Sequence, residues 1–207
     1  MRWRRHALRL ALELVIVFVG VYAAAAFAKY QQQRVDEVRR QQIREALIRE
    51  ITDVTNHTRR ASVNIARGLA QYDTLLKLKR YPPLQPYLES ARFQSHIWQS
   101  TLQSGGLELF EPATVYRLSE FYNELNNGFE QLQQMRRLSE QMLVPMLDAG
   151  PAEFYDLKTG RPRAKYGWYF NAMLELRAIS DSITVRGDSL LAEFKRAGAV
   201  LPSDSVE

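Results

Sequence analysis

Hydrophobic residues recur along most of this chain in steps of three and four, and one uninterrupted apolar run stands near its start. The run extends from Leu10 to Ala28 and holds a single charge, Glu13. Its length approaches the roughly 20 residues that cross a membrane as a helix. We therefore predict a transmembrane helix over residues 10–28, preceded by a basic tail over residues 1–9.

The same run permits a second interpretation, a cleaved signal peptide. The basic start of the chain and the sequence Ala26-Phe27-Ala28 fit a signal peptide with its cleavage site. The length of the run and the absence of a helix breaker before Lys29 favour a retained helix. In either case four arginines packed into nine residues resist translocation, so we expect the N-terminus in the cytoplasm and residues 29–207 outside it.

A long helix is predicted from Lys29 to about Arg80, where no proline occurs. Its buried seam is predicted to comprise Ile43, Leu47, Ile51, Val54, Thr58, Ala61, Ile65, Leu69, Tyr72 and Leu76. The prolines of the stretch 81–86 end this helix, because proline lacks an N–H and restricts the residue before it. A connector is expected there.

Three further helices follow in the pattern. The first is short, from Tyr87 to Gln103, and presents Phe93, Ile97 and Trp98. The second begins near Pro112 and continues, with a kink at Pro145, to Gly150. Its seam is Val115, Leu118, Tyr122, Leu125, Phe129, Leu132, Met135, Leu138, Met142 and Met146. The last runs from about Tyr166 to Ala197, after one helical turn expected within 152–157. Its seam is Tyr169, Met173, Leu176, Ser180, Ile183, Gly187, Leu190, Phe194 and Ala197.

No alternating strand pattern appears, so the chain is predicted to be all-α. Long helices joined by compact breaks favour an antiparallel helical bundle over residues 29–207, into which the transmembrane helix continues. The small residues Ser180 and Gly187 indicate close approach of a neighbouring helix.

Composition narrows the classes of function. The net charge is +5, yet residues 1–29 hold five of the 28 basic and one of the 23 acidic residues, leaving 23 against 22 beyond them. Such a nearly neutral domain gives no reason to expect nucleic-acid binding. The chain has no cysteine, which removes disulfides, thiol nucleophiles and cysteine metal sites.

Two stretches resemble an uncharacterised family of bacterial membrane-anchored proteins with one N-terminal span. The first, residues 13–23, is a glutamate followed by an aliphatic run and Gly-aliphatic. The second runs from Trp98 through Ser104-Gly105 and Leu107-Glu108-Leu109 to Tyr122. The resemblance implies a single-span, largely helical protein. With the topology predicted above, we expect the span in the bacterial inner membrane and the main domain in the periplasm. It supplies no activity.

No arrangement typical of catalysis is found. His57 and His96 belong to no metal-binding pattern, and the chain has no phosphate-binding loop or serine nucleophile elbow. We expect no enzymatic activity, no cofactor and no metal.

One basic and aromatic loop, residues 158–170, is a candidate binding site. Arg161, Arg163 and Lys165 supply groups that bind carboxylate or phosphate, and Trp168 supplies an apolar face. A solvated loop that caps core aromatic residues is the competing interpretation.

Self-association is a second candidate property. Gly20 and Ala24 let helices approach closely in a membrane, and Glu13 can hydrogen-bond a partner there. The seam from Ile43 to Ile51 extends this contact. Two functions therefore remain open: an interaction or scaffold protein that contacts itself or an unknown envelope partner, and a module that binds a small ligand or anionic polymer at the loop.

Overall fold

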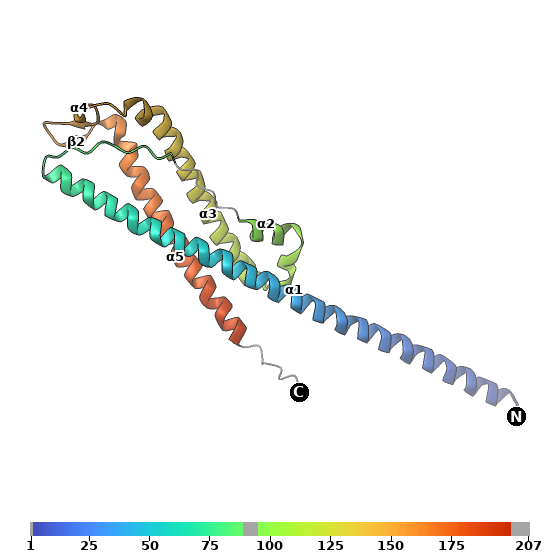
Figure 1. The fold of residues 1–207 in the computed structure, drawn as a ribbon. Coiled ribbons are helices and arrows are strands. Elements are labelled where there is room, and N and C mark those ends of the chain that lie inside the picture. Colours follow the sequence, from blue (N-terminus) through green and yellow to red (C-terminus); the bar gives the residue numbers. More distant parts are fainter. Residues whose placement is uncertain (1, 89–94, 200–207) are drawn as a thin grey trace. The chain divides into compact units, whose positions relative to one another are not determined.

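The computed structural model describes residues 2–88 and 95–199, with side chains over 15–88 and 95–196. These ranges are almost wholly helical (Figure 1), which confirms the predicted all-α class. The longer elements are α1 (Arg2–Lys77), α2 (His96–Gln103), α3 (Pro112–Leu138) and α5 (Gly167–Ala199). The short ones are η1 (Gly106–Leu109), η2 (Ser139–Leu143), η3 (Val144–Met146), α4 (Pro151–Phe154), β1 (Tyr155–Asp156), β2 (Arg161–Pro162) and η4 (Ala164–Tyr166).

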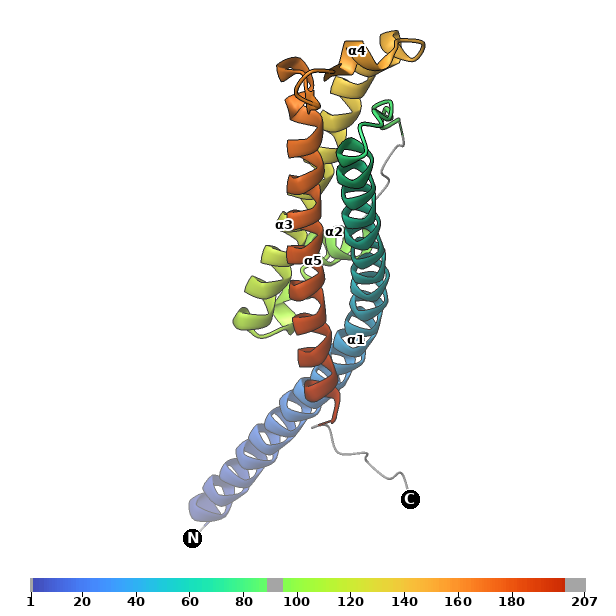
Figure 2. The same cartoon turned by 90° about the vertical axis from the view of Figure 1, so that its left-hand side faces the viewer.

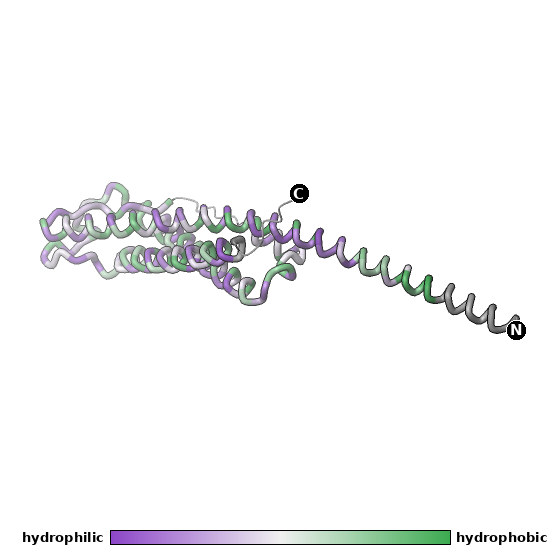
Figure 3. The backbone as a smooth tube through the Cα atoms, turned by 90° about the horizontal axis from the view of Figure 1, so that it is seen from below, coloured by the Kyte–Doolittle hydropathy of each residue, from purple (hydrophilic) through white to green (hydrophobic). Residues whose placement is uncertain are grey.

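By its contacts the chain divides into two units, Met1–Glu45 and Ala46–Glu207. The first unit is the N-terminal part of α1. Every large apolar side chain between Val15 and Phe27 is more than half exposed, and Figure 3 shows hydrophobic residues gathered there. Within the described residues, one helical stretch beginning at Val15 is apolar and long enough to cross a membrane, a property that signal sequences share.

The second unit is built on α1 from Ala46 onward, α3 and α5. Helix α5 packs on α1 through polar contacts between side chains. Thr58 Oγ1 lies 3.0 Å from Thr184 Oγ1, Ser62 Oγ donates to Asp181 Oδ1 at 2.5 Å, and Arg59 binds both carboxylate oxygens of Asp188 at 2.7 Å. Thr58 and Ser62 are one turn apart on α1, and their partners on α5 are Thr184 and then Asp181, so the two helices run in opposite directions here.

Helix α5 also packs on α3, with the same reversal of order. Arg117 and Glu193 form an ion pair at 2.7 Å, and Glu120 pairs with Arg186 at 3.1 Å. Further along, Gly128 lies so close to α5 that a Cβ there would sit 3.1 Å from Cγ2 of Ile179. These contacts give α1 and α3 one direction and α5 the other (Figure 2).

The predicted seams describe the core well. Leu47, Ile51, Leu118, Leu125 and Leu190 are among the buried residues, and Gly187 is buried against α1. Leu47 and Ile51 are fully buried by the chain's own helices. They are therefore not a free surface for self-association, which corrects part of the predicted contact. Ile43 is half-buried.

The connector after α1 differs from the prediction. Helix α1 ends at Lys77, and Lys79 adopts a left-handed φ of 55°. Tyr87 and Leu88 are not helical, so the helix predicted from Tyr87 to Gln103 is wrong at its start. The prolines keep the chain extended, and α2 begins only at His96. Phe93, predicted on that helix, lies outside the described residues.

The end of α3 also departs from the prediction of a simple kink at Pro145. The helix widens into the π-helix η2 at Ser139 and then tightens into the 3-10 helix η3, which contains Pro145. A proline removes one intrahelical hydrogen bond and crowds the preceding turn, so the change of geometry begins upstream of it. Ser139 is buried and accepts the amide of Tyr87 at 3.1 Å.

A hairpin with two strands of two residues each follows α4. The turn predicted within 152–157 is helical up to Phe154, but Tyr155 and Asp156 then form β1, which pairs antiparallel with β2. Strands this short leave no alternating pattern for the sequence to reveal.

Candidate functional site

The basic and aromatic loop is tied together by its own side chains. Asp156 accepts the amide of Lys158 at 2.9 Å and the hydroxyl of Thr159 at 3.0 Å, and the Gly160 amide donates to the Asp156 carbonyl at 2.7 Å. Gly160 has a φ of 71°, a conformation that favours glycine. The Lys158 amide and then the Thr159 hydroxyl lower the pKa of Asp156.

Two of the predicted binding residues serve this hairpin. Lys165 forms an ion pair with Glu153, and its ammonium lies 4.9 Å from the centre of the Tyr166 ring. The pair lowers the pKa of Glu153 and raises that of Lys165. Arg163 Nε donates to the carbonyl oxygen of Ala152 at 2.8 Å. Both cations thus fasten the loop to α4.

The other two predicted binding residues, Trp168 and Arg161, have different surroundings. Trp168 is half-buried and meets Tyr169 edge to face, with ring centres 5.8 Å apart. Its indole nitrogen is buried without a hydrogen-bond partner in the described chain. The side chain of Arg161 is exposed. No described pocket gathers these four residues around a common space.

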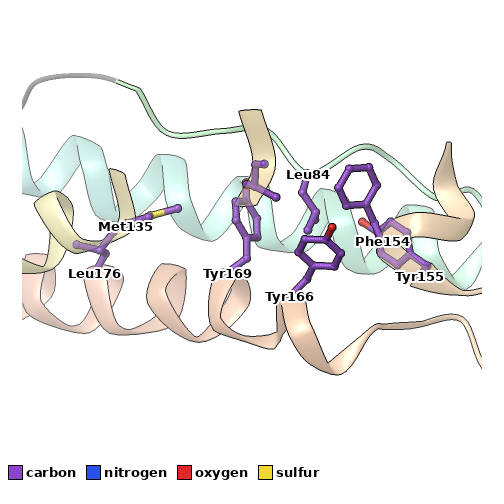
Figure 4. Packing of buried hydrophobic residues seen from close by; sticks show 8 residues of the cluster. Leu84, Met135, Phe154, Tyr155, Tyr166, Tyr169 and Leu176 are labelled. Carbon is purple, nitrogen blue, oxygen red and sulfur yellow. The ribbon is translucent and has the colours of Figure 1, made fainter. Parts of the chain in front are cut away.

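Beside the loop lies a tyrosine-rich core, drawn in Figure 4. Its buried members are Leu84, Met135, Leu143, Phe154, Tyr155, Tyr166, Tyr169 and Leu176. Tyr155 donates its hydroxyl to the Pro82 carbonyl at 2.8 Å, and Tyr72 donates to the Pro83 carbonyl at 2.9 Å. These bonds hold the connector against the helices. Burial raises the pKa of Tyr72, Tyr155 and Tyr169.

A polar cluster around Glu50 joins α1, α2 and α3. The Glu50 carboxylate accepts the Tyr122 hydroxyl at 2.5 Å and the Ile97 amide at 3.0 Å. It thereby caps α2, whose own Ser95 makes no side-chain cap. Trp98 stacks on Tyr122 with ring centres 4.7 Å apart and planes 7° apart. Burial, then the bond to Glu50, raises the pKa of Tyr122. The sequence gives no signal for this cap, because its three members lie far apart along the chain.

The candidate residues for membrane association lie on the first unit. Gly20 is open, since a Cβ there would meet nothing within 4 Å, and Ala24 is exposed. Glu13 lies on α1, outside the residues whose side chains are described.

A cavity of about 820 Å³ lies between α1, α3 and α5, away from the loop. Residues 57–65 of α1, 125–135 of α3 and 173–183 of α5 line it, with Tyr87 from the connector. Its inner wall is apolar, and its polar residues come mainly from α1. The volume is within the range of about 300–1,000 Å³ that small-molecule sites occupy. Sequence reasoning missed this site because its apolar residues have the same periodicity as ordinary core.

The described residues contain no cluster of three histidines, cysteines or carboxylates that could hold a metal. His57 and His96 are both exposed. The cavity offers shape, apolar contact and hydrogen-bonding groups to a ligand.

No known protein family, curated protein or solved structure matches this chain.

Proposed function

We propose that this chain is a membrane-anchored interaction protein of the bacterial envelope without catalytic activity. Residues 10–28 would be its single span, residues 1–9 its cytoplasmic tail, and residues 29–207 an antiparallel helical bundle in the periplasm. The resemblance to single-span bacterial proteins supports the same assignment. Its partners would be the lipid bilayer, a second copy of the chain and an envelope protein, with no nucleic acid.

The observation that carries this proposal is the exposure of the apolar stretch. Phe18, Val21 and Phe27 are 67, 65 and 63% exposed, so α1 itself leaves this apolar surface open. Water disfavours such a surface by about 25 cal/mol for each Å² of apolar area, whereas lipid accepts it. The polar residues that follow from Lys29 mark where this preference ends.

A cleaved signal peptide remains the alternative for this stretch. The continuity of α1 through Ala26-Phe27-Ala28 and beyond Lys29 favours the anchor, because the helix contains no break near the candidate cleavage site. A retained helix also supplies the close-packing face of Gly20 and Ala24, which lie one turn apart. Hydrogen bonds between helices in a membrane, such as one from Glu13, are worth only about 0.6–2 kcal/mol each, so we expect weak, reversible self-association.

Binding of an anion at residues 158–170 is the weaker candidate. Lys165 and Arg163 already contact Glu153 and the Ala152 carbonyl, and Trp168 packs on Tyr169. An incoming anion would have to compete with these contacts.

Matched substitutions in the span test the interaction function. Gly20→Ile and Ala24→Ile should weaken self-association in native membranes, measured by energy transfer between labelled copies. Ala25→Ile adds the same bulk about 100° around the helix from Ala24 and should leave it unchanged. Equal energy transfer in all three variants and the unmodified protein would remove the support for a partner on this face.

A further inference from the structure

We propose that the cavity between α1, α3 and α5 binds a single-chain anionic amphiphile, a long-chain carboxylate, with its tail inside and its head at Arg60. This goes beyond the interaction function and does not depend on which side of a membrane the domain occupies. Every residue that lines the cavity lies between His57 and Ile183.

The inner wall fits an apolar tail. Leu125 and Met135 of α3 and Leu176 and Ile183 of α5 are buried residues that line it. Met173 lies on the same wall, and methionine side chains adapt their shape to flexible apolar ligands. A wall of this composition gives a hydrocarbon chain apolar contact on several sides.

The polar rim comes from one stripe of α1. His57, Arg60 and Asn64 lie three and four residues apart, so they share a face of the helix, and all three are exposed. Arg60 is the one lining residue with a permanent charge, and no described carboxylate lines the cavity. Its Nε donates to the Asn56 carbonyl at 3.2 Å, which leaves the terminal guanidinium nitrogens to bind an acid.

The sign of that charge decides the head group. A carboxylate accepts charge-assisted hydrogen bonds from a guanidinium, whereas an ammonium head would be repelled. An uncharged alcohol would gain the apolar contact but no charge-assisted hydrogen bond. The cavity therefore selects for an amphiphile with one negative end.

Packing on either side of the cavity keeps the space open. In one direction along α1, a Cβ built on Gly187 would lie only 3.2 Å from Thr55 Cβ and from Phe121 Cε2, so α1, α3 and α5 are already in tight contact. In the other, Tyr72 meets Tyr169 and Phe170 edge to face, with ring centres 6.4 and 5.6 Å apart. Because packed interiors do not compress easily, closing the cavity would disturb one of these contacts.

Photo-crosslinking tests the proposal with the full chain in lipid nanodiscs. The probes are dodecanoate and dodecanol, each carrying a diazirine at the tail, and modified peptides are mapped by mass spectrometry. We expect dodecanoate to label wall residues such as Met135, Met173 and Leu176, with competition by unlabelled dodecanoate. Labelling confined to residues 10–28, or absent from the cavity wall, would overturn the proposal.

Matched variants separate the head from the tail. Arg60→Gln should lower saturable labelling of the wall by dodecanoate about tenfold, the size of one charge-assisted hydrogen bond, and leave dodecanol labelling unchanged. Arg67→Gln removes an exposed cation from the same helix outside the cavity and should change neither. Equal dodecanoate labelling in the Arg60 and Arg67 variants would contradict the proposed head site.

Filling the cavity is the complementary test. Ala61→Phe on α1 and Ser180→Phe on α5 each place a ring in the space and should each abolish labelling by both probes. Ala70→Phe adds a ring at an exposed position of α1 outside the cavity and should not. Circular dichroism identifies any variant that fails to fold. Undiminished wall labelling in a folded filling variant would show that the probe does not occupy this cavity.

Discussion

The close approach of α5 to α1 is testable through one glycine. Gly187 of α5 faces α1, and a Cβ built on it would lie 2.1 Å from Thr55 Oγ1 and 3.2 Å from Thr55 Cβ. It would also lie 3.2 Å from Cε2 of the buried Phe121. Because Thr55 Cβ is itself close, rotation of the hydroxyl does not fully clear the space. Gly187→Ala should therefore push α5 away from α1 and α3.

The expected magnitude follows from two opposing effects. Overpacking a well-filled core costs about 1–3 kcal/mol. Alanine in place of a mid-helix glycine recovers about 0.5–1 kcal/mol through its better helix propensity. We expect the free energy of unfolding to fall by about 1–2 kcal/mol. Gly68→Ala is the matched control, since a Cβ there meets nothing within 4 Å and should stabilise by about 0.5–1 kcal/mol.

Urea unfolding of the full chain, read by pulse proteolysis, gives both values. A double-mutant cycle sharpens the test, because Thr55 Oγ1 is buried without a hydrogen-bond partner in the described chain. Thr55→Ala removes the clashing hydroxyl and should recover at least 0.5 kcal/mol of the Gly187→Ala loss, about the smallest coupling that such cycles resolve. If Gly187→Ala were as stable as Gly68→Ala, the close packing of α5 on α1 would be refuted.

Four further results are expected. Glu50→Gln should lower the free energy of unfolding by about 1–2 kcal/mol, because Tyr122 and the Ile97 amide lose a charged acceptor, whereas Glu130→Gln at an exposed position should not. The raised pKa of Tyr122, Tyr155 and Tyr169 gives stability that is complete below the ordinary tyrosine pKa near 10 and declines as pH rises above it, so tyrosinate absorbance should appear together with unfolding. The lowered pKa of Asp156 stabilises the hairpin above the ordinary aspartate pKa, and this stabilisation is lost as pH falls through the pKa of the folded state. Amide chemical shifts of Lys158 and Thr159 should report the loss. Asp156→Asn should remove this pH dependence. An oxidation-dependent reporter fused after Glu207 should be active, and activity of a cytoplasm-only reporter there would reverse the proposed topology.

Most of the fold can be predicted from helical periodicity in the sequence. The seams of α1, α3 and α5 were predictable because residues such as Leu118 and Ile183 must repeat every three to four positions to stay on one buried face. Proline and glycine located the helix ends near Lys77 and Pro112. The predicted start of α2 is wrong because the pattern near Tyr87 suits a helix locally, while the packing of Tyr87 on the tyrosine-rich core and the bond from its amide to Ser139 favour an extended chain.

The candidate sites were less predictable than the fold. The sequence indicated that Arg163 and Lys165 could bind an anion, yet Glu153 and the Ala152 carbonyl, more than ten residues away, already use them. The cavity depends on how far apart three helices are held, which residue spacing within one helix does not report. In the sequence nothing distinguishes Arg60 from the other exposed basic residues of α1; the structure places it at the cavity rim.

Alkaline carbonate extraction of native membranes, followed by intact mass measurement, shows whether the membrane anchor is retained. We expect the protein to stay in the membrane pellet with the N-terminal 28 residues still attached. Release into the supernatant of a chain that begins at Lys29 would contradict it.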